Sequence, residues 1–90
     1  MARHCAYGVQ ALDLKPNYMR AWTNLGISLA NLADYDNSTR YYVRALALNA
    51  KATSVWSYLR TSLTCAGRQD LLPAVDAHDL LALQKALPLE

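Results

Sequence analysis

Two asparagines and one arginine could together bind the end of a peptide chain. Asn24 and Asn31 are seven residues apart, so on a helix they would lie along one line, with Arg20 one turn before Asn24. A side-chain amide both donates and accepts hydrogen bonds, and a guanidinium donates in a fork. This row suits the backbone and the terminal carboxylate of an extended peptide, which are costly to bury without hydrogen bonds. Spacing alone, however, is more often typical of a solvated helix face than of a binding site.

The other reactive side chains predict neither catalysis nor a metal site. His4 and Cys5 are adjacent, so on a helix they would point in different directions, and no further ligands gather near them in the sequence. His78 stands between Asp76 and Asp79 on an expected helix, where a solvated face is the simpler interpretation. The sequence has no phosphate loop, nucleotide-binding fingerprint or Ser-His-Asp order. We therefore expect a protein that is not an enzyme and needs no cofactor or metal. The hydroxyl groups expected on a helix surface are Thr61, Ser62 and Thr64.

The composition favours one small helical domain. The chain has 90 residues, with Leu and Ala abundant and only 3 Gly and 3 Pro. A net charge of +2 on scattered basic residues does not indicate a nucleic-acid partner. Cys5 and Cys65 lack metal-ligand spacing, so both are expected to be reduced thiols of a cytosolic protein. No apolar run reaches the roughly 18 residues of a membrane span and no signal peptide is apparent, so we take the glycosylation match at Asn37 as chance.

Hydrophobic spacing predicts an all-α fold of consecutive helices. Helices are expected over about 3–14, 19–32 and 37–48, then from a cap at Thr53 or Ser54 to about 66, and over about 74–87, with a polar link between the second and the third. Side-chain caps are expected at helix starts, and proline or a left-handed glycine at helix ends. The expected signals are Asn17, Asp34 or Asp36, and Thr53 or Ser54 at starts, and Pro16, Gly67 and Pro88 at ends.

Each expected helix has one apolar face that would contribute to the core. Gly26 lies beside this face in the second helix, where it would let a partner helix approach closely. Tyr42 is expected to pack between helices, whereas Tyr41 could also line a groove. The expected apolar positions are Trp22, Leu25, Leu29 and Leu32; Tyr41, Tyr42, Ala45 and Leu48; Val55, Trp56, Leu59 and Leu63; and Leu80, Leu81 and Leu83.

An internal repeat has a period of 34 residues, which is that of the tetratricopeptide repeat. The run ALDLKP at 11–16 is echoed by ALALNA at 45–50. The run AWTNLG at 21–26 is echoed more loosely by VWSYLR at 55–60. This period predicts stacked helical hairpins, a short piece of a right-handed α-solenoid.

The repeat pattern divides the chain into three parts. A complete tetratricopeptide repeat would cover 19–52, preceded at 1–18 by the second helix of a truncated repeat and followed at 53–90 by a C-terminal helical extension. Ser38 and Ala50 depart from the pattern, which usually has a small alanine and a proline there. The positions that match the pattern are Trp22, Leu25, Gly26, Tyr42 and Ala45.

Three motifs extend the likeness beyond a generic repeat. They are R-x-x-x-N-L-G-I-S-x-x-N at 20–31, VWSYLR at 55–60 and the AxDAHDL ending at 74–80. With them the chain resembles, over roughly 5–83, the C-terminal region of the peroxisomal type 1 targeting-signal receptors, the peroxin-5 family. The paired asparagines and the terminal motif are what a generic tetratricopeptide repeat would not bring.

The resemblance implies a soluble import receptor for peroxisomes or glycosomes, cytoplasmic and cycling to the organelle membrane. Members of that family bind a C-terminal tripeptide of the Ser-Lys-Leu type on cargo proteins. By motif position, Asn24 and Asn31 would bind its backbone and carboxylate, and Arg20 would lie near the same pocket. Docking proteins would be contacted through an N-terminal region that this chain lacks.

The resemblance also implies a fragment with only part of the binding site, because the family's other asparagines lie in earlier repeats. Such a fragment would bind cargo poorly alone, and its unpaired first helix predicts self-association. An alternative stays open, namely a tetratricopeptide-repeat scaffold or adaptor that binds a different protein. A binder of chaperone tails would show a basic clamp where this chain has one arginine and two amides.

Overall fold

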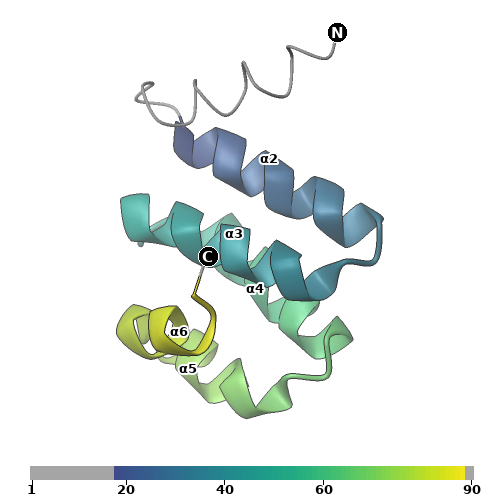
Figure 1. The fold of residues 1–90 in the computed structure, drawn as a ribbon. Coiled ribbons are helices and arrows are strands. Elements are labelled where there is room, and N and C mark those ends of the chain that lie inside the picture. Colours follow the sequence, from purple (N-terminus) through teal and green to yellow (C-terminus); the bar gives the residue numbers. More distant parts are fainter. Residues whose placement is uncertain (1–17, 89–90) are drawn as a thin grey trace, which may run out of the picture.

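The computed structural model describes residues 18–88, which form helices and no strand (Figure 1). The all-α prediction is therefore confirmed for this part of the chain. The helix expected at 3–14, with His4 and Cys5, lies outside the described residues. The elements are α2 (Tyr18–Asn31), α3 (Tyr35–Leu48), α4 (Thr53–Cys65), a short 3-10 turn η1 (Gln69–Leu71), α5 (Leu72–Asp76) and α6 (Leu80–Ala86).

Helix α3 holds the described residues together, since it contacts α2, α4 and α6 (Figure 1). Its buried residues include Val43 and Leu46, which the expected apolar face of this helix did not contain. A central helix is buried on more than one side, so its apolar positions exceed a single stripe. The buried apolar residues are Tyr42, Val43, Ala45, Leu46, Val55, Trp56, Leu59, Leu63, Val75, Leu83 and Leu87.

Three leucines expected in the core are exposed instead. Leu32 follows the last residue of α2 and is 76% exposed, and Leu48 is the last residue of α3 and is 43% exposed. Leu81 is 67% exposed, because the short α6 turns Leu83 rather than Leu81 inward. At helix ends the apolar period continues in the sequence after the packing surface has ended.

Gly26 brings α2 and α3 together as the sequence predicts. A Cβ atom at this position would lie 2.6 Å from Cε1 of Tyr42, whose ring is almost fully buried. Below the ring, Ser38 donates a hydrogen bond of 2.7 Å to the Gly26 carbonyl oxygen and lies 3.2 Å from the Ser62 hydroxyl. Ser62 is therefore buried between helices, so its predicted place on a helix surface is wrong.

The start of two helices differs from the sequence prediction. Asp34 caps α3 by accepting a hydrogen bond from the backbone N–H of Asn37, so the helix begins at Tyr35, two residues earlier than expected. Helix α4 has Ala52 at its cap position with no side-chain hydrogen bond. Thr53 and Ser54 lie inside α4, so the prediction that either caps it is wrong.

The single helix expected over 74–87 is two helices, α5 and α6. The break is at His78, whose backbone has a φ of +54°. Asp79 then caps α6 by accepting a hydrogen bond of 3.2 Å from the N–H of Ala82. The His78 ring stacks on the Trp56 ring at 4.2 Å, so the turn is packed against α4. Gly67 does end α4 in the left-handed conformation, with φ +76°, as the sequence predicts.

Candidate peptide-binding site

The three residues of the expected peptide site share one exposed side of α2. Arg20, Asn24 and Asn31 are all exposed, and the two asparagines lie within about 20° of each other around the helix axis. Within residues 18–88 none of the three makes a side-chain hydrogen bond or an ion pair. The amide and guanidinium groups therefore remain free to bind a ligand in this part of the chain. We name these three residues the amide row.

The opposite side of α2 fixes this row in place. Gly26 presses against Tyr42, and the Trp22 ring stacks on Tyr41 with centroids 5.3 Å apart and planes at 18°. Thr23 does not leave a free hydroxyl in this packing, because it donates 3.0 Å to the carbonyl oxygen of Met19. Because α2 is packed along its length, its backbone holds the three positions of the amide row in a fixed arrangement along the helix.

The amide row offers the kinds of hydrogen-bonding group that the end of a peptide chain requires. Two amides supply donors and acceptors for a peptide backbone, and the guanidinium supplies a forked donor for a carboxylate. The row has no carboxylate or imidazole that could act as a base. Its ligand would be held by uncharged hydrogen bonds along the backbone, with one charge-assisted bond at the end.

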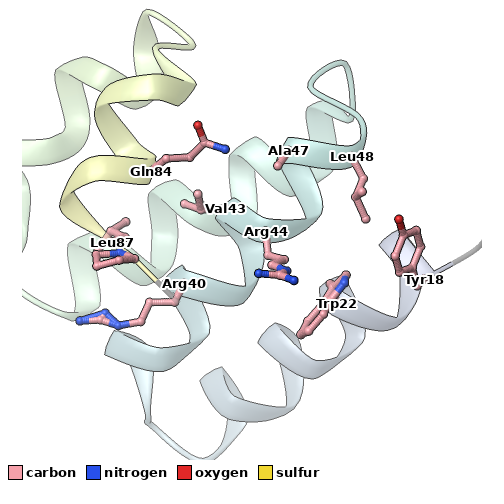
Figure 2. A pocket seen from close by; sticks show the side chains of 10 residues that line it. Tyr18, Trp22, Arg40, Val43, Arg44, Ala47, Leu48, Gln84 and Leu87 are labelled. Atoms are coloured by element: carbon pink, nitrogen blue, oxygen red, sulfur yellow. The ribbon is translucent and has the colours of Figure 1, made fainter. Parts of the chain in front are cut away.

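The structure shows a second candidate surface that the sequence prediction missed. A groove of about 340 Å³ lies between α2, α3 and the end of α6 (Figure 2). It contains two arginines of α3, Arg40 and Arg44, which are four residues apart and so follow each other by one helical turn. That spacing was the available signal, but nothing in the sequence placed α6 over it. The groove is lined by Tyr18, Trp22, Arg40, Val43, Arg44, Ala47, Leu48, Gln84, Leu87 and Pro88.

Two ion pairs lie on the surface outside the amide row and the groove. Arg60 donates from Nε and Nη2 to the two carboxylate oxygens of Asp76, at 3.0 and 3.3 Å, and this hydrogen bonding holds the pKa of Asp76 below its usual 3.8. Arg68 does the same to Asp70 at 3.1 Å and lowers its pKa. Asp76 is thus engaged by an arginine, and the His78 ring stacks on Trp56. Among residues 18–88 no three His, Cys, Asp or Glu side chains gather in a way that could hold a metal ion.

No helix among the described residues has both the length and the apolar character needed to cross a membrane. Comparison with known proteins gives no match to any family model and no match to a curated protein sequence.

Proposed function

We propose that the chain is a tetratricopeptide-repeat module, part of a soluble receptor that binds the C-terminal targeting tripeptide of proteins imported into peroxisomes or glycosomes. The repeat assignment is supported by two successive helix pairs with short links. Trp22 and Trp56, 34 residues apart, each lie near the start of the first helix of a pair. The tight contact of Gly26 with Tyr42 joins the two helices of one pair, at positions that the repeat pattern requires.

The observation that carries the proposal is the exposed amide row. Asn24 and Asn31 are two turns apart, about 10.5 Å along the helix axis at 1.5 Å per residue. An extended peptide advances about 3.3 Å per residue, so this distance matches three residues of ligand. A tripeptide could therefore lie along α2 with its backbone between the two amides and its carboxylate toward a guanidinium.

Selectivity for a chain end would follow from charge. A free C-terminus carries a carboxylate that an internal peptide lacks, and a hydrogen bond to a charged group contributes about 1.5–3 kcal/mol. Such a bond from Arg20 would favour the chain end over an internal segment by at least tenfold. The cycling of the receptor between cytoplasm and organelle, and its docking partners, belong to the same proposal.

Nuclear magnetic resonance of the 90-residue chain tests the proposal, because it detects weak binding residue by residue. The titrant is a short peptide that ends in Ser-Lys-Leu, in its free-acid form and in its C-terminally amidated form. We expect the side-chain amide signals of Asn24 and Asn31 to shift with the acid and not with the amide. Asn24→Ala should weaken binding, whereas Asn37→Ala, an exposed asparagine on α3, should not.

Equal shifts with the acid and the amidated peptide would show that the terminal carboxylate is not recognised. Shifts confined to residues outside α2, or unchanged binding by Asn24→Ala, would show that the amide row is not the binding site. Either result would favour the alternative, a tetratricopeptide-repeat scaffold or adaptor with a different partner. The groove between α2, α3 and α6 is the observation that supports that second function.

A further inference from the structure

The groove combines an apolar wall with two arginines, and none of the residues among 18–88 that line it carries a carboxylate. Val43, Leu48 and Leu87 supply aliphatic surface, and Trp22 and Tyr18 supply aromatic surface. Figure 2 shows Arg44 beside Trp22 in the middle of the groove, Arg40 near Leu87 at one end, and Tyr18 with Leu48 at the other. The order along the groove is thus apolar end, first guanidinium, second guanidinium.

Arg44 carries a positive charge that the described residues leave uncompensated. Its guanidinium carbon lies 4.9 Å from the centroid of the Trp22 ring, and Arg44 itself is exposed. No carboxylate of residues 18–88 lies within ion-pair distance of it. The Trp22 ring holds the guanidinium in position by a cation–π contact, which leaves its N–H groups available to an acceptor.

Arg40 supplies an independent sign of a missing acceptor. Its Nη2 atom lies 3.5 Å from an oxygen of Asp36, but its Nη1 atom is buried and has no hydrogen-bond partner. Buried donors in proteins are nearly always satisfied, so an unsatisfied guanidinium nitrogen at the end of a groove calls for an acceptor other than residues 18–88. The exposed Asp36 pairs with the other nitrogen and does not satisfy this one.

We propose that this groove binds an acidic segment of a partner protein, with one apolar and two acidic side chains in the pattern Leu-x-Glu-x-Glu. In an extended segment alternate residues face the same way at about 7 Å spacing, close to the one-turn separation of Arg40 and Arg44. The leucine would rest at the Tyr18 and Leu48 end, and the two carboxylates would bind Arg44 and then Arg40. A volume of about 340 Å³ fits a few side chains, which limits the ligand to such a short stretch.

This proposal is independent of the targeting-signal receptor. Trp22, which lines the groove, and Asn24, which belongs to the amide row, are two residues apart and so point about 160° apart around α2. A ligand in the groove therefore leaves the amide row open. Variants of Arg44 and Arg20 consequently separate the two surfaces.

Fluorescence anisotropy of labelled peptides with the 90-residue chain tests the proposal. The probe is an end-blocked Leu-Ser-Glu-Ser-Glu peptide, measured beside its reversed sequence, a double Glu→Gln peptide, and a scrambled peptide of the same composition. We expect saturable binding of the probe or of its reversed sequence. The affinity for the Gln peptide should be about tenfold or more weaker. Binding should also weaken as salt is raised.

The matched variants are Arg44→Gln, Arg40→Gln and Arg20→Gln. We expect the first two to weaken binding of the probe about tenfold or more and the third to leave it unchanged. Circular dichroism shows whether each variant is folded, and Arg44→Gln is the safer test because Arg44 is exposed.

Three results would overturn the proposal. They are equal binding of the Glu and Gln peptides, unchanged binding by Arg44→Gln, and no saturable binding of any peptide by the folded chain. A fourth would reassign the groove, namely a dimer in sedimentation velocity that Arg44→Gln dissociates. In that case a second copy of the chain, not an acidic partner, fills the groove.

Discussion

The contact between α2 and α3 at Gly26 predicts that Gly26→Ala destabilises the protein, although alanine is the better helix former. The substitution adds one methyl group at Gly26, which is the buried residue of α2. That methyl group would lie 2.6 and 2.8 Å from two ring carbons of Tyr42 and 3.2 Å from the carbonyl oxygen of Ser38. The first two distances are far below a normal carbon–carbon contact of about 3.5–4.0 Å.

Two opposing effects set the magnitude. Replacing glycine by alanine inside a helix gains about 0.5–1 kcal/mol from the lower entropy of the unfolded chain. Overpacking a core costs about 1–3 kcal/mol, and the Tyr42 ring cannot swing away because it is 2% exposed. Separation of the helices would also stretch the 2.7 Å hydrogen bond from Ser38 to the Gly26 carbonyl, a bond that contributes about 1 kcal/mol. The net expectation is a loss of about 1–3 kcal/mol.

Urea unfolding followed by circular dichroism measures this loss, and a double-mutant cycle with Tyr42→Leu assigns its cause. In the Tyr42→Leu background the added methyl group has room, so Gly26→Ala should become neutral or stabilising by up to about 1 kcal/mol. A chain of this size loses about 4–8 °C of Tm for each kcal/mol, so a thermal melt gives the same answer. Stabilisation by Gly26→Ala in the wild-type background, or an equal effect in both backgrounds, would refute the close contact.

Three further predictions follow from single features of the fold. Ser38→Ala should lower the free energy of unfolding in urea by about 1–2 kcal/mol, because it removes the hydrogen bond to Gly26 and leaves the buried Ser62 hydroxyl short of a partner. The control Ser28→Ala, at an exposed position of α2, should be near neutral. Ala33→Gly should stabilise by about 0.5–1 kcal/mol, since Ala33 is exposed and has a φ of +63° that glycine adopts without strain; an unchanged or lower Tm would contradict this. Hydrogen bonds from Arg60 lower the pKa of Asp76, so this residue contributes stability that is present above its usual pKa of 3.8 and is lost as the pH falls through the lower folded value. The difference in unfolding free energy between wild type and Asp76→Asn should therefore shrink below pH 3.8. A difference that stayed constant with pH would count against the ion pair.

The helical class and the central contacts could be predicted from the sequence because they depend on local period and on residue size. Trp56, Leu59 and Leu63 recur at helical spacing and are buried, and Tyr42 packs between helices as expected. Gly26 signalled a close approach because glycine has no Cβ atom to hold the two helices apart. These features need only the identity of a residue and its neighbours along one helix.

The ends of helices were harder to predict, and His78 shows why. Residues Ala33, Gly67 and His78 all close a helix in the same way, with a positive φ, and in each case the next residue donates to a carbonyl oxygen five residues back. Only Gly67 is the residue type that sequence rules expect, so only that stop was predicted. At His78 the strain of the left-handed backbone is offset by stacking on Trp56, a contact between distant parts of the chain that no local rule contains.

The two candidate sites differ in the same way, since one depends on local sequence and the other on contacts between distant elements. The amide row was predictable because Asn24 and Asn31 are two helical turns apart, whereas the groove depends on how α6 folds back on α3, which the expected single helix over 74–87 excluded. The turn at His78 is therefore what brings Gln84 and Leu87 to the two arginines of α3. It follows that a change which straightens this turn should abolish the groove while the amide row, on the far side of α2, keeps its geometry. The two candidate surfaces thus depend on different parts of the sequence.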